Sequence, residues 1–358
     1  MPKNINKTAQ NLYLEEIKGP VLDDFLEKGW YRMGPTIFSS FYIFYKNELF
    51  STIWLRTQLE SYQNTKSLKK LNRKNRAVLA HKVEKFQYTA ELEALYQKYR
   101  VGFKGNLPDT LASYMMDSLS LPIYDTCLLS VYHDDTLIAC SIFDLGEKTL
   151  ASIFGFYDPV YSNYSLGLYT MLLEIAYGQE QDMDTYYVGY FVPGNPRFDY
   201  KLRLGGIEYL DFKTREWYGI AQFDYEKTPI KIIAQKLTAL QTSLKKEYGA
   251  NLYQNAFIDV HIIEYFPMRY LDDPLFLIFE GLSSYKSEEN VVVITYDVQA
   301  SAYKLYHCHI LHSVFSNYNP DWLKGLDDET FKYQMVIKKT LKTCKTAKPI
   351  VKFFLEQK

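Results

Sequence analysis

Cysteine is scarce in this chain and long apolar runs are missing. The four cysteines, Cys127, Cys140, Cys308 and Cys344, lie far apart and form no CxxC pair. This spacing argues against a paired-cysteine metal or redox motif and predicts a reduced protein without structural disulfides. No stretch approaches the roughly 20 uncharged apolar residues that span a bilayer. The first residues also lack an apolar core before a cleavage site. We therefore expect a cytoplasmic protein with no membrane partner.

Acidic residues are missing from one stretch of an otherwise balanced chain. The formal net charge is −1, so composition gives no general indication of nucleic acid, and no DNA partner is expected. Residues 66–82 nevertheless contain no Asp or Glu, and Leu68, Leu71, Val78 and Leu79 fall near one helical face. A basic helix of this kind suits contact with RNA phosphates, and an ordinary solvated face is the alternative. The residues expected to bind tRNA are Lys66, Lys69, Lys70, Arg73, Lys74 and Arg76.

The 358 residues, of which 47% are hydrophobic, are enough for two or three domains. A helix is expected at 22–28, a small antiparallel sheet at 30–55 with a turn at 46–48, and a helix at 91–99. The middle predicts strands at 127–132, 136–144, 149–157, 185–192 and 207–212, with a helix at 165–179 between the third and fourth. Beyond residue 217 we expect a helix at 229–248, strands at 275–282, 291–297 and 302–315, and a closing basic helix at 328–345.

These elements predict an α+β protein with three regions. The divisions are 1–100, a small N-terminal α/β region with the basic helix, 101–217, a catalytic domain, and 218–358, an additional C-terminal α+β domain of unknown role. The strand and helix order of the middle region resembles the N-acetyltransferase (GNAT) fold, a mixed sheet flanked by helices. In that fold a glycine-rich loop with an Arg holds coenzyme A, whereas here only Ser165 and Gly167 remain. An ordinary strand–loop–helix without a ligand is the alternative for this loop.

Several short motifs resemble the arginyl- and leucyl-tRNA–protein transferases. The strongest is Phe156–Ser162, reading FYDPVYS, followed by Ser165–Tyr169 and by Glu174-Ile175. Weaker matches are Gly29–Gly34, Lys66–Lys70, Leu95–Tyr99 and Tyr187–Gly194 with Lys201, so that the resemblance covers about residues 23–217. The chain departs from the family in lacking its N-terminal cysteine pairs near residues 36–44 and in carrying Asn195 where the family has Cys.

The resemblance implies transfer of Arg or Leu from a charged tRNA to the N-terminal amine of a protein, a tag of the N-degron type. Aminoacyl-tRNA would be the co-substrate, and no other cofactor is expected. The ester is already activated and the α-amine has a pKa near 8. The protein therefore needs only to hold both groups together and stabilise the oxyanion. Such a site is expected as a cleft beside the 157–168 turn, open toward residues 66–82.

The backbone at Ser165 and Gly167 is expected to face the reacting carbonyl or the terminal adenosine, with Tyr157, Tyr187 and Tyr190 lining the pocket. Asp158 would orient or deprotonate the amine, or else cap the turn before Pro159. An acceptor beginning with Asp or Glu needs a cationic pocket. The candidates for it are Arg32, Arg56, Arg197 and Lys201.

Two other functions share these features. One is an acyl-CoA-dependent N-acyltransferase of the same fold, and the other is a non-catalytic relative that binds tRNA or protein. A cluster near the C-terminus, His307-Cys308-His309-x-x-His312, suggests a metal site at first sight. On a strand, His307 and His309 share one face while Cys308 and His312 share the other, so we expect no metal site there.

Overall fold

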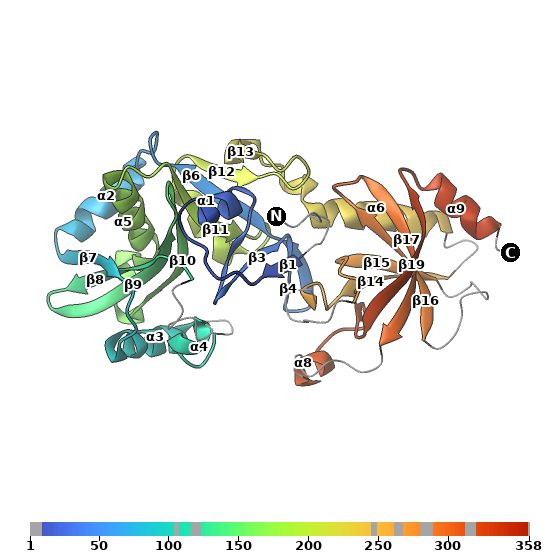
Figure 1. Ribbon diagram of the computed structural model, residues 1–358, viewed down its shortest axis with the longest axis horizontal. Coiled ribbons are helices and arrows are strands. Elements are labelled where there is room, and N and C mark those ends of the chain that lie inside the picture. Colours follow the sequence, from blue (N-terminus) through green and yellow to red (C-terminus); the bar gives the residue numbers. More distant parts are fainter. Residues whose placement is uncertain are drawn as a thin grey trace.

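The computed structural model describes residues 9–103, 107–115, 123–244, 249–260, 268–279, 289–311 and 320–356. Figure 1 shows two lobes side by side along the longest axis, with the N-terminal two thirds in one lobe and the C-terminal third in the other. The expected α+β class, with a mixed sheet flanked by helices and a further C-terminal α+β region, is confirmed. Among the described helices, none has the length and apolar character to cross a membrane.

The larger lobe is built on an eight-stranded sheet in the order β13-β12-β6-β11-β10-β9-β8-β7. Its strands are β6 (Ile53–Gln58), β7 (Leu79–Lys85), β8 (Thr126–His133), β9 (Thr136–Leu145), β10 (Thr149–Tyr157), β11 (Thr185–Phe191), β12 (Ile207–Leu210) and β13 (Trp217–Gly219). Neighbours are antiparallel except β10 and β11, which run parallel. Because β6 and β7 come from the first hundred residues, the boundary expected at residue 100 falls within one shared sheet.

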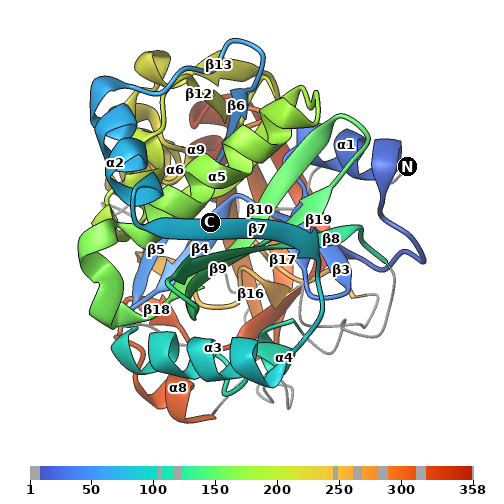
Figure 2. The ribbon, with the colours of Figure 1, turned by 90° about the vertical axis from the view of Figure 1, so that its left-hand side faces the viewer.

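Helices cover both faces of this sheet (Figure 2). One face carries α2 (Lys66–Arg76) and α5 (Leu166–Glu180), and the other carries α3 (Ala90–Gly102) and α4 (Leu111–Tyr114). Ten of the fifteen residues of α5 are buried, since the helix is apolar around most of its circumference. Gly178 lets α5 approach closely, because a Cβ there would lie 2.6 Å from the Leu150 side chain.

The N-terminal segment packs against the α3 side of the sheet, over β10 and β11. It consists of β1 (Ala9–Leu12), α1 (Gly19–Glu27), β2 (Tyr31–Met33) and β3 (Thr36–Ser40), with a three-stranded sheet in the order β1-β3-β2. Trp30, Tyr31 and Ile37 join Trp54, Ala151 and Tyr187 of the large sheet in one core. Gly29 ends α1 with φ +75°, as expected for a residue that closes a helix.

A hairpin of β4 (Tyr42–Tyr45) and β5 (Glu48–Ser51) joins the two lobes. Its turn residues Lys46 and Asn47 both have positive φ, so the expected turn is confirmed. Phe41 and Tyr42 are buried in the core of the C-terminal lobe, and the Phe41 ring meets Phe212 edge-on at 4.7 Å. The hairpin therefore belongs to the C-terminal core although it is made early in the chain.

The C-terminal lobe is a six-stranded sheet in the order β18-β14-β15-β16-β17-β19. Its elements are α6 (Pro229–Leu244), β14 (Ala250–Asn255), β15 (Leu275–Phe279), β16 (Asn290–Asp297), β17 (Ala302–Leu311), α8 (Pro320–Lys324), β18 (Thr330–Phe331), β19 (Gln334–Cys344) and α9 (Lys348–Leu355). Helices α6 and α9 share one core with the hairpin. The strands expected after residue 275 and the helix at 229 are confirmed as far as the described residues extend.

Two expected helices are wrong in whole or in part. The closing basic helix at 328–345 is instead the strand β19, which pairs with β17 along its length. Its lysines recur at helical spacing, but Met335, Val336 and Ile337 are buried together and pairing overrides the pattern. The basic helix of 66–82 ends at Arg76, and Leu79 begins strand β7. Val78 is 49% exposed rather than on an apolar helical face.

Candidate functional site

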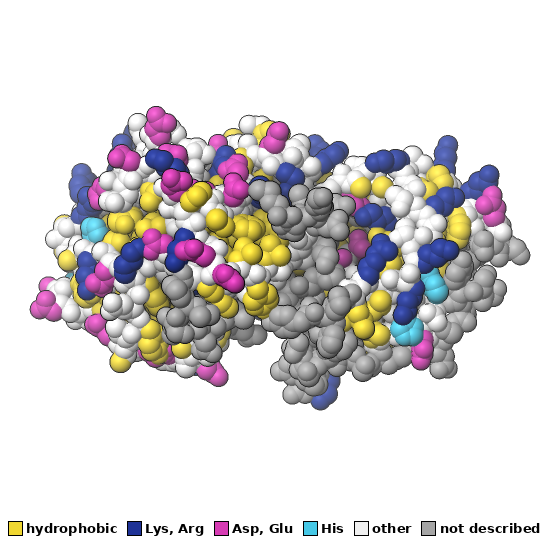
Figure 3. Space-filling view, in the orientation of Figure 1, with side chains coloured by type: hydrophobic (Ala, Val, Ile, Leu, Met, Phe, Trp, Pro, Cys, Tyr) yellow, Lys and Arg dark blue, Asp and Glu magenta, His cyan; other side chains and the backbone are white. Residues whose placement is uncertain are grey.

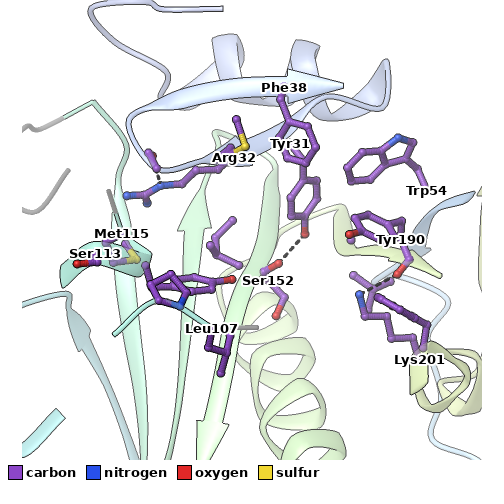
Figure 4. Close-up of a pocket in the computed structure, with 18 residues that line it drawn as sticks. Tyr31, Arg32, Phe38, Trp54, Leu107, Ser113, Met115, Ser152, Tyr190 and Lys201 are labelled. Atoms are coloured by element: carbon purple, nitrogen blue, oxygen red, sulfur yellow. Dashed lines mark hydrogen bonds between the residues drawn. The ribbon is translucent and has the colours of Figure 1, made fainter. Parts of the chain in front are cut away.

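A cavity of about 420 Å³ lies where β10 and β11 separate. The two parallel strands pair only over Thr149–Ala151 and Thr185–Tyr187, and each has an irregularity immediately afterwards. The cavity is lined by these strands, by β2 and β3, by α4 and by the short helix η3 (Pro196–Arg203) (Figure 4). Parallel strands that part in this way leave backbone and side chains exposed in the middle of a sheet.

Tyr31 closes the point at which the strands part. Its hydroxyl donates to the carbonyl oxygens of Ser152 on β10, at 2.7 Å, and of Tyr187 on β11, at 2.8 Å. Burial, together with the nearby Glu174 and Asp144, raises the pKa of the Tyr31 hydroxyl well above its usual value, so it stays a donor. Residue type gave no indication of this role for Tyr31, although it lies inside the Gly29–Gly34 motif.

Lys201 is a cation of this cavity that pairs with no acidic residue in the described ranges. Its Nζ donates to the Tyr190 carbonyl at 2.9 Å and lies over the rings of Tyr190 and Phe198. Burial lowers the pKa of the ammonium to about 8. Gly189, with φ +81°, leaves room for it, since a Cβ there would lie 3.1 Å from Nζ. Within the described part of the chain no carboxylate pairs with Lys201, so an incoming anion can.

The three arginines expected beside Lys201 are engaged elsewhere. Arg32 lines the same cavity, but its guanidinium pairs with the fully buried Asp144 at 2.8 Å and donates to Thr126 Oγ1. Arg56 lies between Glu27 and Glu208, away from the cavity lining. Arg197 is exposed, donates to the Tyr45 hydroxyl at 3.0 Å and covers the Phe103 ring. The structure therefore brings Arg32 and Lys201 to one cavity and leaves the other two outside it.

The expected tyrosines are divided in the same way. Tyr190 lines the cavity and its ring stacks on Phe198. Tyr187 is buried, donates to Glu27 at 3.0 Å and packs against Trp217. Tyr157 ends β10, and its ring meets Tyr99 at 5.4 Å. The three therefore do not line a single pocket.

Aromatic side chains connect Tyr157 with the cavity. Its ring contacts Tyr99, the ring of Tyr99 contacts Phe154 at 6.2 Å, and Phe154 stacks on Tyr114 at 3.9 Å. Tyr114 is part of the cavity wall. A continuous aromatic strip thus runs from the end of β10 to the cavity.

Asp158 holds the turn that follows β10. Its carboxylate accepts from the Val160 N–H at 3.1 Å, at the start of the short helix η2 (Pro159–Tyr164), and pairs with Lys98 at 2.8 Å. Burial opposes the charge, but the bonds from Lys98 and the Val160 N–H outweigh it and lower the pKa of the carboxyl. Asp158 is thus present as an ion engaged in capping, the alternative considered from the sequence.

The turn enters α5 at the exposed Ser165, which is followed by the buried Leu166 and the half-buried Gly167. Ser165 has φ 51° and ψ 49°, and its side chain makes no capping bond. In the part of the chain that the structure describes, no acceptor reaches the N–H groups of Leu166 and Gly167. Gly167 lies against Tyr157, whose Cε1 would be 3.8 Å from a Cβ. The start of α5 therefore offers free donors at the positive end of the helix dipole.

The basic helix α2 lies beside this turn. Lys74 Nζ donates to the Asn163 carbonyl at 3.2 Å, and the buried Asn75 donates to the Tyr164 carbonyl at 2.8 Å. The residues expected to bind tRNA, namely Lys66, Lys69, Lys70, Arg73, Lys74 and Arg76, are all exposed. The expectation of one cleft shared with the turn needs correction, because α2 and α5 cover one face of the sheet and the cavity opens on the other.

Glu174 of α5 lies buried beneath the separated strands. Its Oε2 accepts from the Tyr186 hydroxyl at 2.6 Å. Burial raises the pKa of the carboxyl to about 7, against hydrogen bonds from Ser141, Tyr186 and Ser152. No role for Glu174 could be read from its residue type, although Glu174-Ile175 is part of the motif.

The comparisons with known proteins agree with these motifs. Residues 91–211 match the family described as "Arginine-tRNA-protein transferase, C terminus". An aspartate/glutamate leucyltransferase of Leptospira interrogans is 26% identical over 205 residues, which are 56% of this chain and 78% of the relative. The arginyl-tRNA–protein transferase 1 of Drosophila melanogaster is 29% identical over 141 residues, or 35% of this chain and 29% of the relative. Over residues 91–211 the chain therefore resembles the C-terminal region of the arginyl/leucyl-tRNA–protein transferases, as its motifs predicted.

Solved structures resemble the chain only distantly. A GCN5-related glucosamine N-acetyltransferase region of a fungal multi-domain β-N-acetylglucosaminidase has a TM-score of 0.33 at 14% identity, covering 56% of this chain and 22% of that one. The C-terminal domain of a lysylphosphatidylglycerol synthetase of Agrobacterium fabrum, described as putative, has a TM-score of 0.32 at 11% identity, covering 39% and 47%.

Proposed function

We propose that this chain transfers Arg or Leu from a charged tRNA to the N-terminal α-amine of proteins that begin with Asp or Glu. Support for the acidic acceptor comes mainly from Lys201, a half-buried cation that lines a cavity at the middle of the sheet and has no carboxylate partner among the described residues. The names of relatives add both the acidic acceptor residues and the two donor amino acids.

The acceptor enters the cavity on the α3 side of the sheet. A carboxylate placed at Lys201 would form a charge-assisted hydrogen bond in an environment where few waters compete. At neutral pH the ammonium is protonated, because its pKa of about 8 lies above 7. The aromatic wall formed by Trp54, Tyr114 and Tyr190 surrounds the rest of the first residue.

The donor approaches from the other end of the aromatic strip. The RNA backbone would rest on α2, and its terminal adenosine would lie near Ser165 and Gly167, whose neighbours have free N–H groups. The ester is bonded to the ribose of that adenosine, so both would lie together along Tyr157 and Tyr99, with the ester directed toward Tyr114 and the cavity. The two substrates thus meet where β10 and β11 part.

The reaction needs position more than an activated side chain. The amine nitrogen attacks the ester carbonyl carbon, a tetrahedral oxyanion forms, and the bond from that carbon to the ribose oxygen breaks. The proton lost by the amine ends on the released ribose hydroxyl. Asp158 stays charged because its pKa is lowered, so we assign it a positioning role that holds the turn against α3. Aminoacyl-tRNA is the only co-substrate we propose.

An acyl-CoA-dependent transferase is the second candidate, favoured only by the exposed start of α5. The test is incubation of the full chain with labelled Arg-tRNA or Leu-tRNA and peptides that begin with Asp, Glu or Ala, beside labelled acetyl-CoA. We expect label on the Asp and Glu peptides from one of the two tRNAs. Label from acetyl-CoA alone, or equal labelling of all three peptides, would contradict the proposal.

A further inference from the structure

The C-terminal lobe has its own concentration of positive charge. Residues 330–355 contain seven lysines and no Asp or Glu. Figure 3 shows Lys and Arg side chains over one face of this lobe, beside His side chains, with few acidic groups among them. Strands β17 and β19 carry the residues considered below, which we call the C-terminal basic strip: His307, His309, Lys338, Lys339 and Lys342.

Strand register places these side chains together. His307 pairs directly with Lys339 across β17 and β19, and on its other side with Val292. Lys342 pairs with Leu305, which in turn pairs with Ile294. Val292, Leu305 and Ile294 face the core under α6, so His307, Lys339 and Lys342 point to that same face. Helix α6 packs on β14, β15 and β16, and α9 packs on β19 near Lys342, whose Nζ lies 5.8 Å from the centre of the Phe353 ring. Lys338 and Lys339 remain exposed.

The irregular pairing of β19 adds Lys338 to the strip. Lys339 faces His307 while Ile337 faces Cys308, so Lys338 is an extra residue without a partner on β17. Lys338 and Lys339 are exposed, and the pKa of His307 is lowered by burial and then by His309, Lys338 and Lys339. Lys338 and Lys339 are therefore close enough to His307 to disfavour its protonated form.

Within the described residues, none of Lys338, Lys339 and Lys342 has a carboxylate partner. Like charges directly opposite each other destabilise a sheet. Lysines on an edge strand do protect it from pairing with other chains, and that accounts for β19. It does not account for His307, which is opposite Lys339 on β17, an inner strand. An anion bound across β17 and β19 would account for the lysines and for His307.

We propose that the C-terminal basic strip binds the phosphate backbone of the tRNA, as a second contact beyond α2. This inference rests on the proposed function, which makes charged tRNA the donor. A polyanion of constant charge spacing suits several lysines in a row, and such contacts read no sequence.

The placement of the two lobes favours an RNA over a smaller anion. Helix α2 lies at one end of the long axis, and β17 and β19 lie in the other lobe (Figure 1). The lobes are held together by the β4–β5 hairpin, whose Phe41 and Tyr42 are in the C-terminal core, and by a bond from the Ile230 N–H to Ser51 Oγ at 3.0 Å. Two basic surfaces at a fixed separation match a long, stiff polyanion that reaches both.

The test compares two triple variants of the full chain that lose the same charge. K338Q/K339Q/K342Q changes the strip, and K213Q/K227Q/K231Q changes three exposed lysines outside it. Affinity for uncharged tRNA is measured by fluorescence anisotropy over a salt series. We expect the first variant to bind several-fold more weakly, with the slope of log K against log salt reduced by roughly 2–3. The second should match the parent chain.

A transfer assay locates the effect on the donor. With full-length charged tRNA, kcat/KM should fall for the strip variant in proportion to affinity. With an aminoacylated minihelix that has only the acceptor arm, it should not change. Equal binding by the two triple variants would overturn the inference, as would strip-dependent binding to phosphatidylglycerol vesicles or to an acidic peptide in place of tRNA. If the parent chain shows no transfer but the strip variant still loses affinity for tRNA, the proposed function is rejected and this inference stands.

Discussion

Lys98 of α3 and Asp158 at the end of β10 form an ion pair of 2.8 Å that ties a helix on one face of the sheet to the turn preceding α5 on the other. The same carboxylate caps η2 through the Val160 N–H. One side chain thus sets the position of the turn relative to both layers. This turn also places Ser165 and Gly167 at the start of α5.

Replacing Asp158 separates positioning from proton transfer. Asp158→Ala removes the cap and the ion pair, and we expect a loss of about 1–2 kcal/mol of unfolding free energy together with reduced transfer. Asp158→Asn keeps a capping oxygen and should retain most of the stability and most of kcat. Urea denaturation and single-turnover transfer measure the two effects. A carboxylate acting as the base would instead make Asn as inactive as Ala.

Lys201 should make acceptor recognition depend on pH. Because its pKa is about 8, affinity for a peptide beginning with Glu should fall as pH rises through 8, relative to the same peptide beginning with Ala. The Ala peptide corrects for titration of the α-amine itself. Lys201→Gln should abolish the difference between the two peptides, and Lys201→Arg should keep it at higher pH. Competition assays at pH 6.5 to 9.5 would show it, and a Gln variant that still prefers Glu would contradict the assignment.

The same lysine should lower stability. The pKa of Lys201 is depressed from 10.5 in the unfolded chain to about 8 in the folded protein. The stability associated with its neutral form is therefore present above pH 10.5 and is lost as pH falls through 8. Lys201→Met should therefore be more stable than the parent chain at pH 7, by about 1–3 kcal/mol, with the gain shrinking toward alkaline pH. Denaturation midpoints at pH 7 and pH 10 test this sign.

Glu174 should give the opposite dependence. Its folded pKa is raised from 4.5 to about 7, so the stability it contributes is present below pH 4.5 and is lost as pH rises through 7. Glu174→Gln should flatten the fall of unfolding free energy between pH 5 and 8. Unfolding at four pH values in that interval is sufficient, and an unchanged slope in the variant would argue against a raised pKa.

Tyr31→Phe tests the separation of the two parallel strands. Loss of the hydroxyl leaves the Ser152 and Tyr187 carbonyls without their shared donor, at a cost of about 1–3 kcal/mol. We expect kcat to fall as well, because the cavity is formed by the same strands. Tyr124→Phe is the matched control, since that buried hydroxyl also donates to a carbonyl, of Thr36, at 2.6 Å. If both variants lose similar stability but only Tyr31→Phe loses transfer activity, the role of Tyr31 in forming the cavity is supported.

Helix α2 is the proposed RNA contact that lies nearest the site, and its exposed basic residues can be tested directly. Changing Lys69, Lys70 and Arg73 to Gln removes three exposed charges without touching Asn75, which anchors the helix to Tyr164. Affinity for tRNA should drop and its salt slope should decrease by roughly 2–3. Filter binding measures both, and an unchanged slope would remove α2 from the RNA contact.

Local pattern was sufficient for most elements. The hairpin at β8 and β9, the apolar α5 and the turn at Lys46-Asn47 all follow from residue periodicity and turn chemistry within about 15 residues. Local pattern failed for β19, where lysines at helical spacing hid a strand. The partner that decides the matter, β17, is a separate segment of the sequence, and no local propensity reports it.

The site shows the same limit. Lys201 could be selected as a cation in a family motif, but the sequence could not show that the described residues give it a carbonyl partner and no carboxylate. Arg32 looked equivalent until Asp144, 112 residues later, proved to neutralise it. Tyr31 and Glu174 act through strands that meet only in the folded sheet. Residue type and motif indicate candidates, whereas availability depends on contacts between distant segments.

The β4–β5 hairpin has a consequence for how the protein is made. Phe41 and Tyr42 leave the ribosome early, while the helix and strands that cover them, α6 and β15 to β17, are synthesised some two hundred residues later. Until those segments emerge, Phe41 can pack only against nearer residues such as Phe212. A chain shortened after residue 217 would lack α6 and β15 to β17, so the family-like part should aggregate when produced alone.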